Sequence, residues 1–149
     1  MEKRLKNLED AYKWSKETAK ALRTGNFAAI DTDALVDEIE SIASGIERAL
    51  ESTLRDILEA LLWKQYTNAD PHEIDQQLLR AQVRLQSLFQ STPSLHDAMI
   101  ESVMDEAYRT ARRYVSEDYG VSLPDRCPFP LEQILEDPME RLVAQGRLA

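Results

Sequence analysis

The sequence has few of the residues that metal sites and nucleophilic catalysis require. Its 149 residues include one cysteine, Cys127, and two histidines, His72 and His96. A lone cysteine forms no internal disulfide, and a zinc site needs several cysteine or histidine ligands. Di-metal helical bundles need a Glu-x-x-His pair on each of two helices, but Ala69 and Pro93 stand three positions before these histidines. We therefore expect no metal and no cofactor.

Glycine and long apolar runs are scarce too. The four glycines lie far apart, at positions 25, 45, 120 and 146, so the sequence has no glycine-rich loop for binding phosphate. No uncharged stretch approaches the ~20 residues of a membrane span, and the first ten residues carry six charges instead of an apolar leader. Together with the single cysteine, these features predict a cytosolic protein that does not engage a membrane.

The chain has an excess of acidic residues, with 27 against 18 basic ones and a net charge of −9. Such a charge repels nucleic-acid phosphates, so nucleic acid is not the expected partner. The excess is uneven, because residues 1–25 have a net charge of +3 and residues 31–66 a net charge of −6. Either a basic first helix lies against an acidic second one, or the acidic helix binds a basic partner or acts as a crude mimic of nucleic acid.

Helical periodicity is abundant, above all in residues 31–66. Large aliphatic side chains recur there at steps of three and four, which is the spacing of one face of an amphipathic helix: Leu35, Ile39, Ile42, Ile46, Leu50, Leu54, Ile57 and Leu61. We predict one long helix over this range, with Asp31 or Asp33 as its N-cap. The glycine in its interior predicts a bend or a close helix crossing near Ser44 and Gly45.

Shorter patterns predict the remaining elements. Further helices are expected over residues 2–24, 71–90, 94–120 and 131–136, followed by a last helix from 138 to Gly146. Closely spaced prolines predict an extended strap over residues 121–130, with Phe129 as its apolar anchor. The expected fold is all-α, a bundle of four main helices with a proline-rich strap and one or two short C-terminal helices. We expect a single domain, residues 1–149, with the four-helix core in 1–120 and the strap and short helices in 121–149.

One polar cluster is a candidate site. Glu38 lies at the edge of the apolar stripe of the long helix, where a carboxylate can turn inward, and Tyr108 and Arg112 lie one turn apart on the fourth helix. A half-buried Glu38–Arg112 pair with the Tyr108 hydroxyl would form a polar site between the second and fourth helices. A purely structural ion pair is the alternative. Cys127, beside Arg126, is expected to be a small apolar contact and not a nucleophile.

The third and fourth helices also carry a set of arginines: Arg80, Arg84, Arg109, Arg112 and Arg113. Pairing with neighbouring surface carboxylates is the simpler interpretation of this set. Binding of nucleic acid through these side chains would require all of them on one continuous face.

Several short motifs occur in a recognisable order. They lie at Trp14, 21–23, 35–40, 61–66, 93–95, 107–112 and 127–135, the last reading Cys-Pro-Phe-Pro-Leu-Glu-Gln-Ile-Leu. In this order and spacing the chain resembles, over about residues 10–137, the bacterial family catalogued as domain of unknown function twenty-nine. The resemblance implies an all-helical single domain and brings no assigned activity. The chain departs from the family pattern at Trp63-Lys64, whose order is reversed, and at Ile74 and Gln82, where Trp and Arg are expected.

The sequence favours a cytosolic interaction module without catalysis. Its expected partner is a protein, either a second copy of the chain in a homo-oligomer or another protein, bound through an exposed helix face. The alternative is a small enzyme or ligand-binding domain that uses Glu38, Tyr108 and Arg112 around a pocket.

Overall fold

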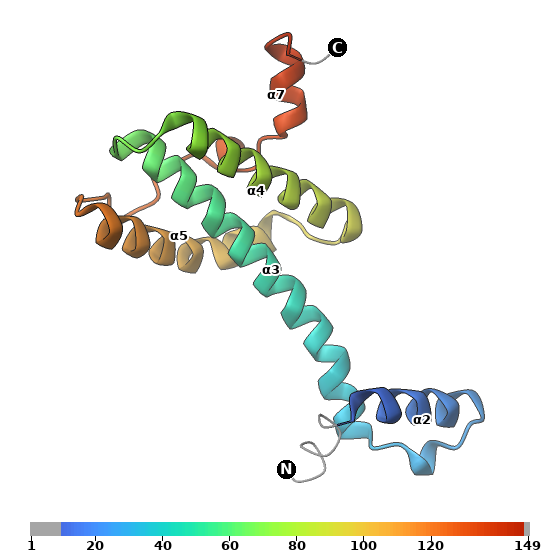
Figure 1. The fold of residues 1–149 in the computed structure, drawn as a ribbon. Coiled ribbons are helices and arrows are strands. Elements are labelled where there is room, and N and C mark those ends of the chain that lie inside the picture. Colours follow the sequence, from blue (N-terminus) through green and yellow to red (C-terminus); the bar gives the residue numbers. More distant parts are fainter. Residues whose placement is uncertain (1–9, 148–149) are drawn as a thin grey trace. The chain divides into compact units, whose positions relative to one another are not determined.

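The protein is built from helices alone within residues 10–147, the part of the chain that its computed structural model describes (Figure 1). The elements in chain order are α2 (Ala11–Arg23), the 3-10 turn η1 (Phe27–Ala29), α3 (Thr32–Tyr66), α4 (Pro71–Ser91), α5 (Asp97–Tyr119), α6 (Leu131–Ile134) and α7 (Pro138–Ala144). The all-α prediction is confirmed. No strand occurs in this range.

Aspartate caps set the start of α3, α4 and α7. The Asp31 carboxylate accepts a hydrogen bond from the Ala34 amide at 3.2 Å, so the predicted N-cap of the long helix is confirmed. Asp70 and Asp137 do the same for α4 and α7, and each is followed by a proline at the first helical position. These side chains satisfy amides that have no partner inside the helix.

Two predicted helix starts are wrong. The first helix does not run on through Asp10, because this residue is the N-cap of α2 and its carboxylate accepts from the Lys13 amide at 3.0 Å. The predicted part of that helix in residues 1–9 lies outside the described residues. The fourth helix begins at Asp97 and not at residue 94, because the Leu95 amide donates to the Thr92 carbonyl and holds this segment in a turn.

The chain forms two compact units, and the boundary falls inside α3. They are Met1–Ile46 and Glu47–Ala149, so the junction lies one residue beyond Gly45. A Cβ atom added to Gly45 would meet nothing within 4 Å among the described residues, so the predicted close crossing is absent there. The predicted bend and the predicted single domain remain predictions.

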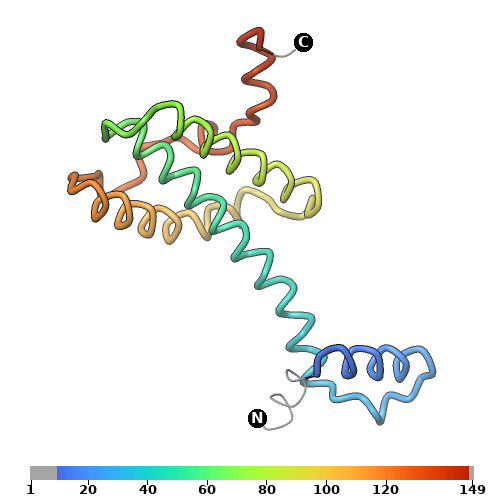
Figure 2. Tube along the Cα trace, viewed as in Figure 1, coloured from blue at the N-terminus to red at the C-terminus, as the bar shows by residue number. Residues whose placement is uncertain are grey.

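The second unit contains the core. Figure 2 shows the later part of α3 lying alongside α4 and α5. Fully buried side chains from these helices form one cluster that also includes Leu123 and Phe129 of the strap and Ile134 of α6. Phe129 is 7% exposed, so its predicted role as anchor of the strap is confirmed.

The first unit is built differently. Its helix α2 packs against η1, and Ala21 is the one buried hydrophobic residue among its described residues. None of the helices in residues 10–147 combines the length and apolarity needed to cross a membrane.

Candidate functional site

Tyr108 and Arg112 hold the strap onto α5. The Tyr108 hydroxyl donates to the Pro124 carbonyl at 2.6 Å, and the Arg112 guanidinium donates to Asp125 at 2.9 Å and to the Leu123 carbonyl at 3.3 Å. The structure thus brings two of the three predicted site residues together, through strap atoms that periodicity alone does not identify. A guanidinium that bridges two strap residues is suited to fixing a loop.

A cleft of about 610 Å³ opens beside this contact, and Cys127 lies on its wall. Burial raises the pKa of the Cys127 thiol, which donates a weak hydrogen bond to the Phe129 carbonyl at 3.7 Å. Burial and the nearby Cys127 likewise raise the pKa of Tyr108. Both groups are therefore protonated near neutral pH. A protonated thiol is a poor nucleophile, which agrees with the expectation for Cys127.

Glu38, the third predicted site residue, belongs to the first unit and is exposed there, not half-buried. Its expected pairing with Arg112 stays a prediction. Among the other arginines, Arg84 pairs with Asp56 and Arg109 pairs with Glu106 at 2.8 Å. Carboxylate pairing thus accounts for these two side chains, as the simpler interpretation expects.

A second cleft, between α3 and α4 in the second unit, was not indicated by any sequence motif. It has a volume of about 760 Å³, and we call it the α3/α4 cleft; its lining residues are Asp56, Glu59, Trp63, Gln77, Leu79, Arg80, Val83 and Arg84. The α3 members recur at steps of three and four and so share one helix face. That spacing was the available sequence signal, but only the fold shows that α4 forms the opposite wall.

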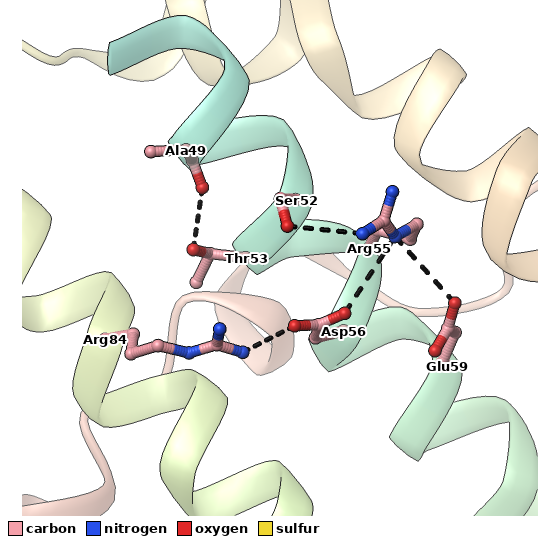
Figure 3. A network of polar contacts seen from close by, with 7 residues as sticks. All are labelled: Ala49, Ser52, Thr53, Arg55, Asp56, Glu59 and Arg84. Carbon is pink, nitrogen blue, oxygen red and sulfur yellow. Dashed lines mark hydrogen bonds and ion pairs between the residues drawn. The ribbon is translucent and has the colours of Figure 1, made fainter. Parts of the chain in front are cut away.

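Three residues of this cleft, Asp56, Glu59 and Arg84, belong to a network of polar contacts (Figure 3). Arg84 reaches from α4 to the carboxylate of Asp56, and Arg55 lies between Asp56 and Glu59 with its Nε 3.9 Å from a carboxylate oxygen of each. The Thr53 hydroxyl donates to the Ala49 carbonyl one turn earlier. Arg55 donates a hydrogen bond to the Ser52 hydroxyl at 3.2 Å, but its contacts with the two carboxylates are longer than hydrogen bonds, so Glu59 is only weakly compensated.

Glu59 has the most perturbed titration in the described part of the chain. Burial, and then the neighbouring Asp56, raise the pKa of its carboxyl from 4.5 to about 7, while Arg55 acts in the opposite direction. Its side chain is 14% exposed. Near neutral pH this carboxyl is therefore partly protonated and able to donate a hydrogen bond.

Trp63 lines the same cleft and has an unusual polar atom. Its indole Nε1 is buried and has no hydrogen-bond acceptor within residues 10–147. The ring itself makes edge contacts with Tyr114 and Tyr119 of α5, at centroid distances of 6.5 and 6.4 Å. An unsatisfied buried donor costs roughly 1–3 kcal/mol.

The first unit presents a contrasting, apolar surface. Val36, Ile39 and Ile42 lie on the first half of α3 and are 45%, 58% and 65% exposed; we call them the α3 stripe. The same periodic pattern continues into the second unit, where Leu50 and Leu54 are 1% and 0% exposed. One helix thus has a covered half and a half whose apolar side chains reach solvent.

No group of three or more His, Cys, Asp or Glu side chains with a metal-binding arrangement occurs within the described range. A family model described as "Domain of unknown function DUF29" matches residues 8–139, which is most of the chain. No curated protein and no solved structure matches the chain. The match extends from the region before α2 into α7, covers most of each compact unit and includes all three surfaces described above. The chain therefore belongs to the family Domain of unknown function DUF29.

Proposed function

We propose that this protein is an interaction module that self-associates through its first unit. The observation that carries the proposal is the α3 stripe, three aliphatic side chains that stay 45–65% exposed on a helix whose large aliphatic side chains are buried from Leu50 onward. Amphipathic helices are stable in proteins chiefly because their apolar face packs on a neighbour. Within residues 10–46 the structure provides very little such packing, because a single hydrophobic residue is buried there.

Charge indicates what covers the stripe. The first half of α3, residues 32–46, carries four acidic and no basic side chains, for a net charge of −4. Helix α2 carries four basic side chains and one acidic, for a net charge of +3. Two α3 segments placed side by side would repel one another, whereas an α2 segment from a second copy would bring opposite charge to the rim of the stripe.

Helix α2 also has apolar side chains to contribute. Tyr12 and Leu22 are 76% and 45% exposed, and Phe27 in the following η1 turn is 67% exposed. In the proposed dimer α2 of each copy packs on the α3 stripe of the other, so the same contact occurs twice around a two-fold axis. Such a pairing is closed and does not continue into a filament. The proposal includes no catalysis. It includes the cytosolic location that the sequence predicts.

The test compares two variants by size-exclusion chromatography with light scattering. Ile42→Glu places a charge in the centre of the stripe, and Val143→Glu is the matched control, because Val143 in α7 is 53% exposed and lies in the other unit. The wild type and V143E are expected to be dimers of about 34 kDa, twice the 17.1 kDa of the chain, and I42E a monomer. Circular dichroism checks that each variant keeps its helix content. A dimeric I42E with wild-type helix content would contradict the proposal.

A further inference from the structure

The α3/α4 cleft has the composition of a small-molecule site and belongs to the second unit, whereas the proposed dimer contact belongs to the first. Its walls are mainly apolar, and Val83 on α4 is 46% exposed although it faces this hollow. The volume of about 760 Å³ falls within the range of roughly 300–1,000 Å³ that small-molecule pockets occupy. The charged and polar side chains of the lining determine which head group such a ligand would carry.

The charges that line the cleft do not cancel evenly. Asp56 and Arg84 neutralise one another through their ion pair. Arg80 also lines the cleft, and it has no ion pair or hydrogen bond with any residue in the 10–147 range. One cation is therefore left for a ligand, while the carboxylate of the paired Asp56 is already satisfied.

The remaining polar groups donate hydrogen bonds. The Trp63 indole N–H has no acceptor in the described structure. Burial and the neighbouring Asp56 raise the pKa of Glu59, so its carboxyl keeps its proton over part of the neutral range. The positive groups around it are Arg55, Arg80 and Arg84. Of these three, only Arg55 forms an ion-pair contact with it, at 3.9 Å. A protonated carboxyl can donate, as an indole and a guanidinium do. Three donors without acceptors thus belong to one apolar hollow.

We infer that the α3/α4 cleft binds an organic anion with a hydrophobic body, such as an aliphatic carboxylate or sulfonate. The anionic head group accepts hydrogen bonds from Arg80 and from the donors at Glu59 and Trp63, while the hydrocarbon part lies on Leu79 and Val83. Charge-assisted hydrogen bonds of this kind are about twice as strong as neutral ones. A ligand with a cationic head group would leave all three donors without acceptors.

The experiment uses the full chain in a Trp14→Phe background, so that Trp63 is its only tryptophan. Decanesulfonate and decyltrimethylammonium, which have the same alkyl chain and permanent opposite charges, are titrated below their micelle concentrations while Trp63 fluorescence is recorded. Saturable binding of decanesulfonate is expected, and it should be at least about tenfold tighter than binding of the cation. Equal or tighter binding of the cation, or no saturable binding of the anion, would overturn the inference.

Variants in the same Trp14→Phe background test whether Arg80 and Glu59 bind the anionic head group. Arg80→Gln is expected to weaken decanesulfonate binding by about tenfold or more, whereas Arg113→Gln, an exposed arginine of α5 outside the cleft, should leave it unchanged. Wild-type affinity should fall by up to about tenfold from pH 6 to pH 8, as Glu59 loses its proton beside the anion. Glu59→Gln should bind with the pH 6 affinity at both pH values, because an amide keeps a donor without a charge. An R80Q variant that binds as the wild type does, or an E59Q variant that keeps the pH dependence, would contradict the assignment.

Discussion

Replacing Glu59 by glutamine is expected to stabilise the protein at alkaline pH and to remove one source of its pH dependence. In the folded chain burial and Asp56 raise the pKa of this carboxyl from 4.5 to about 7. Below pH 4.5 it is protonated in both the folded and the unfolded chain. Between pH 4.5 and 7 the unfolded chain releases the proton while the folded chain retains it, so this contribution to stability is lost as the pH rises.

The size of the effect follows from the pKa. A rise from 4.5 to about 7 corresponds to roughly 3 kcal/mol, at ~1.4 kcal/mol for each pH unit. Water reaches part of the side chain and screens the charge, which reduces the expected contribution to about 1–2 kcal/mol. Glutamine has nearly the same shape and no titration in this range, so the unfolding free energy of E59Q should rise relative to the wild type by that amount between pH 4.5 and pH 8.

Urea unfolding followed by circular dichroism, at pH values from 4.5 to 8, measures this difference directly. Glu101→Gln is the matched control, because Glu101 is an exposed carboxyl of α5 in the same unit. Its stability curve should run parallel to that of the wild type. Parallel curves for E59Q and the wild type, or an E59Q variant that loses stability relative to the wild type as the pH rises, would refute the assignment of a raised pKa to Glu59.

Three further substitutions test the fold and the proposed contact. Leu58→Ala, in a fully buried position of α3, should lower the unfolding free energy by about 2–5 kcal/mol in urea titrations; a loss below about 1 kcal/mol would show that this position is not packed as described. Tyr108→Phe removes the hydrogen bond to the Pro124 carbonyl and should cost about 0.5–1.5 kcal/mol, with faster hydrogen exchange confined to the strap. Lys20→Glu on α2 should weaken dimerisation at low ionic strength. It should have little effect in 1 M salt, where charges more than about 3 Å apart are screened. If the variant changes the sedimentation coefficient equally at both salt concentrations, opposite charges do not stabilise the contact.

Sequence alone predicted the features that depend on neighbouring residues. Asp31 and Asp70 cap their helices as expected because a capping aspartate acts on amides two or three residues away. The start of α2 is a local feature too, but it was missed. Asp10 stands among good helix formers, where propensity predicts a helix that passes through this position, whereas its side chain caps the start of α2.

The sequence did not predict the features that depend on contacts between residues far apart in the chain. Tyr108 and Arg112 were recognised as a polar pair, but their partners on the strap lie 11 to 16 residues further along the chain, and no periodicity places them. The environment of Glu59 likewise depends on α4, since Arg84 lies 28 residues away from Asp56. The helical spacing of Ile39 and Ile42 was recognised and Val36 was not part of that pattern, but spacing does not distinguish the covered half of the helix from the exposed half.

The most direct test of the account is sedimentation equilibrium of the unmodified full chain over a series of concentrations. Self-association through the α3 stripe predicts a weight-average mass that rises toward about 34 kDa and levels off there, because a two-fold pairing is closed. Ile42→Glu removes ~1–2 kcal/mol of favourable free energy of apolar burial from the contact made by each copy. The dimer dissociation constant of that variant should therefore rise by about 30-fold or more. A wild-type mass that stays at 17.1 kDa at the highest concentration loaded would contradict the central claim.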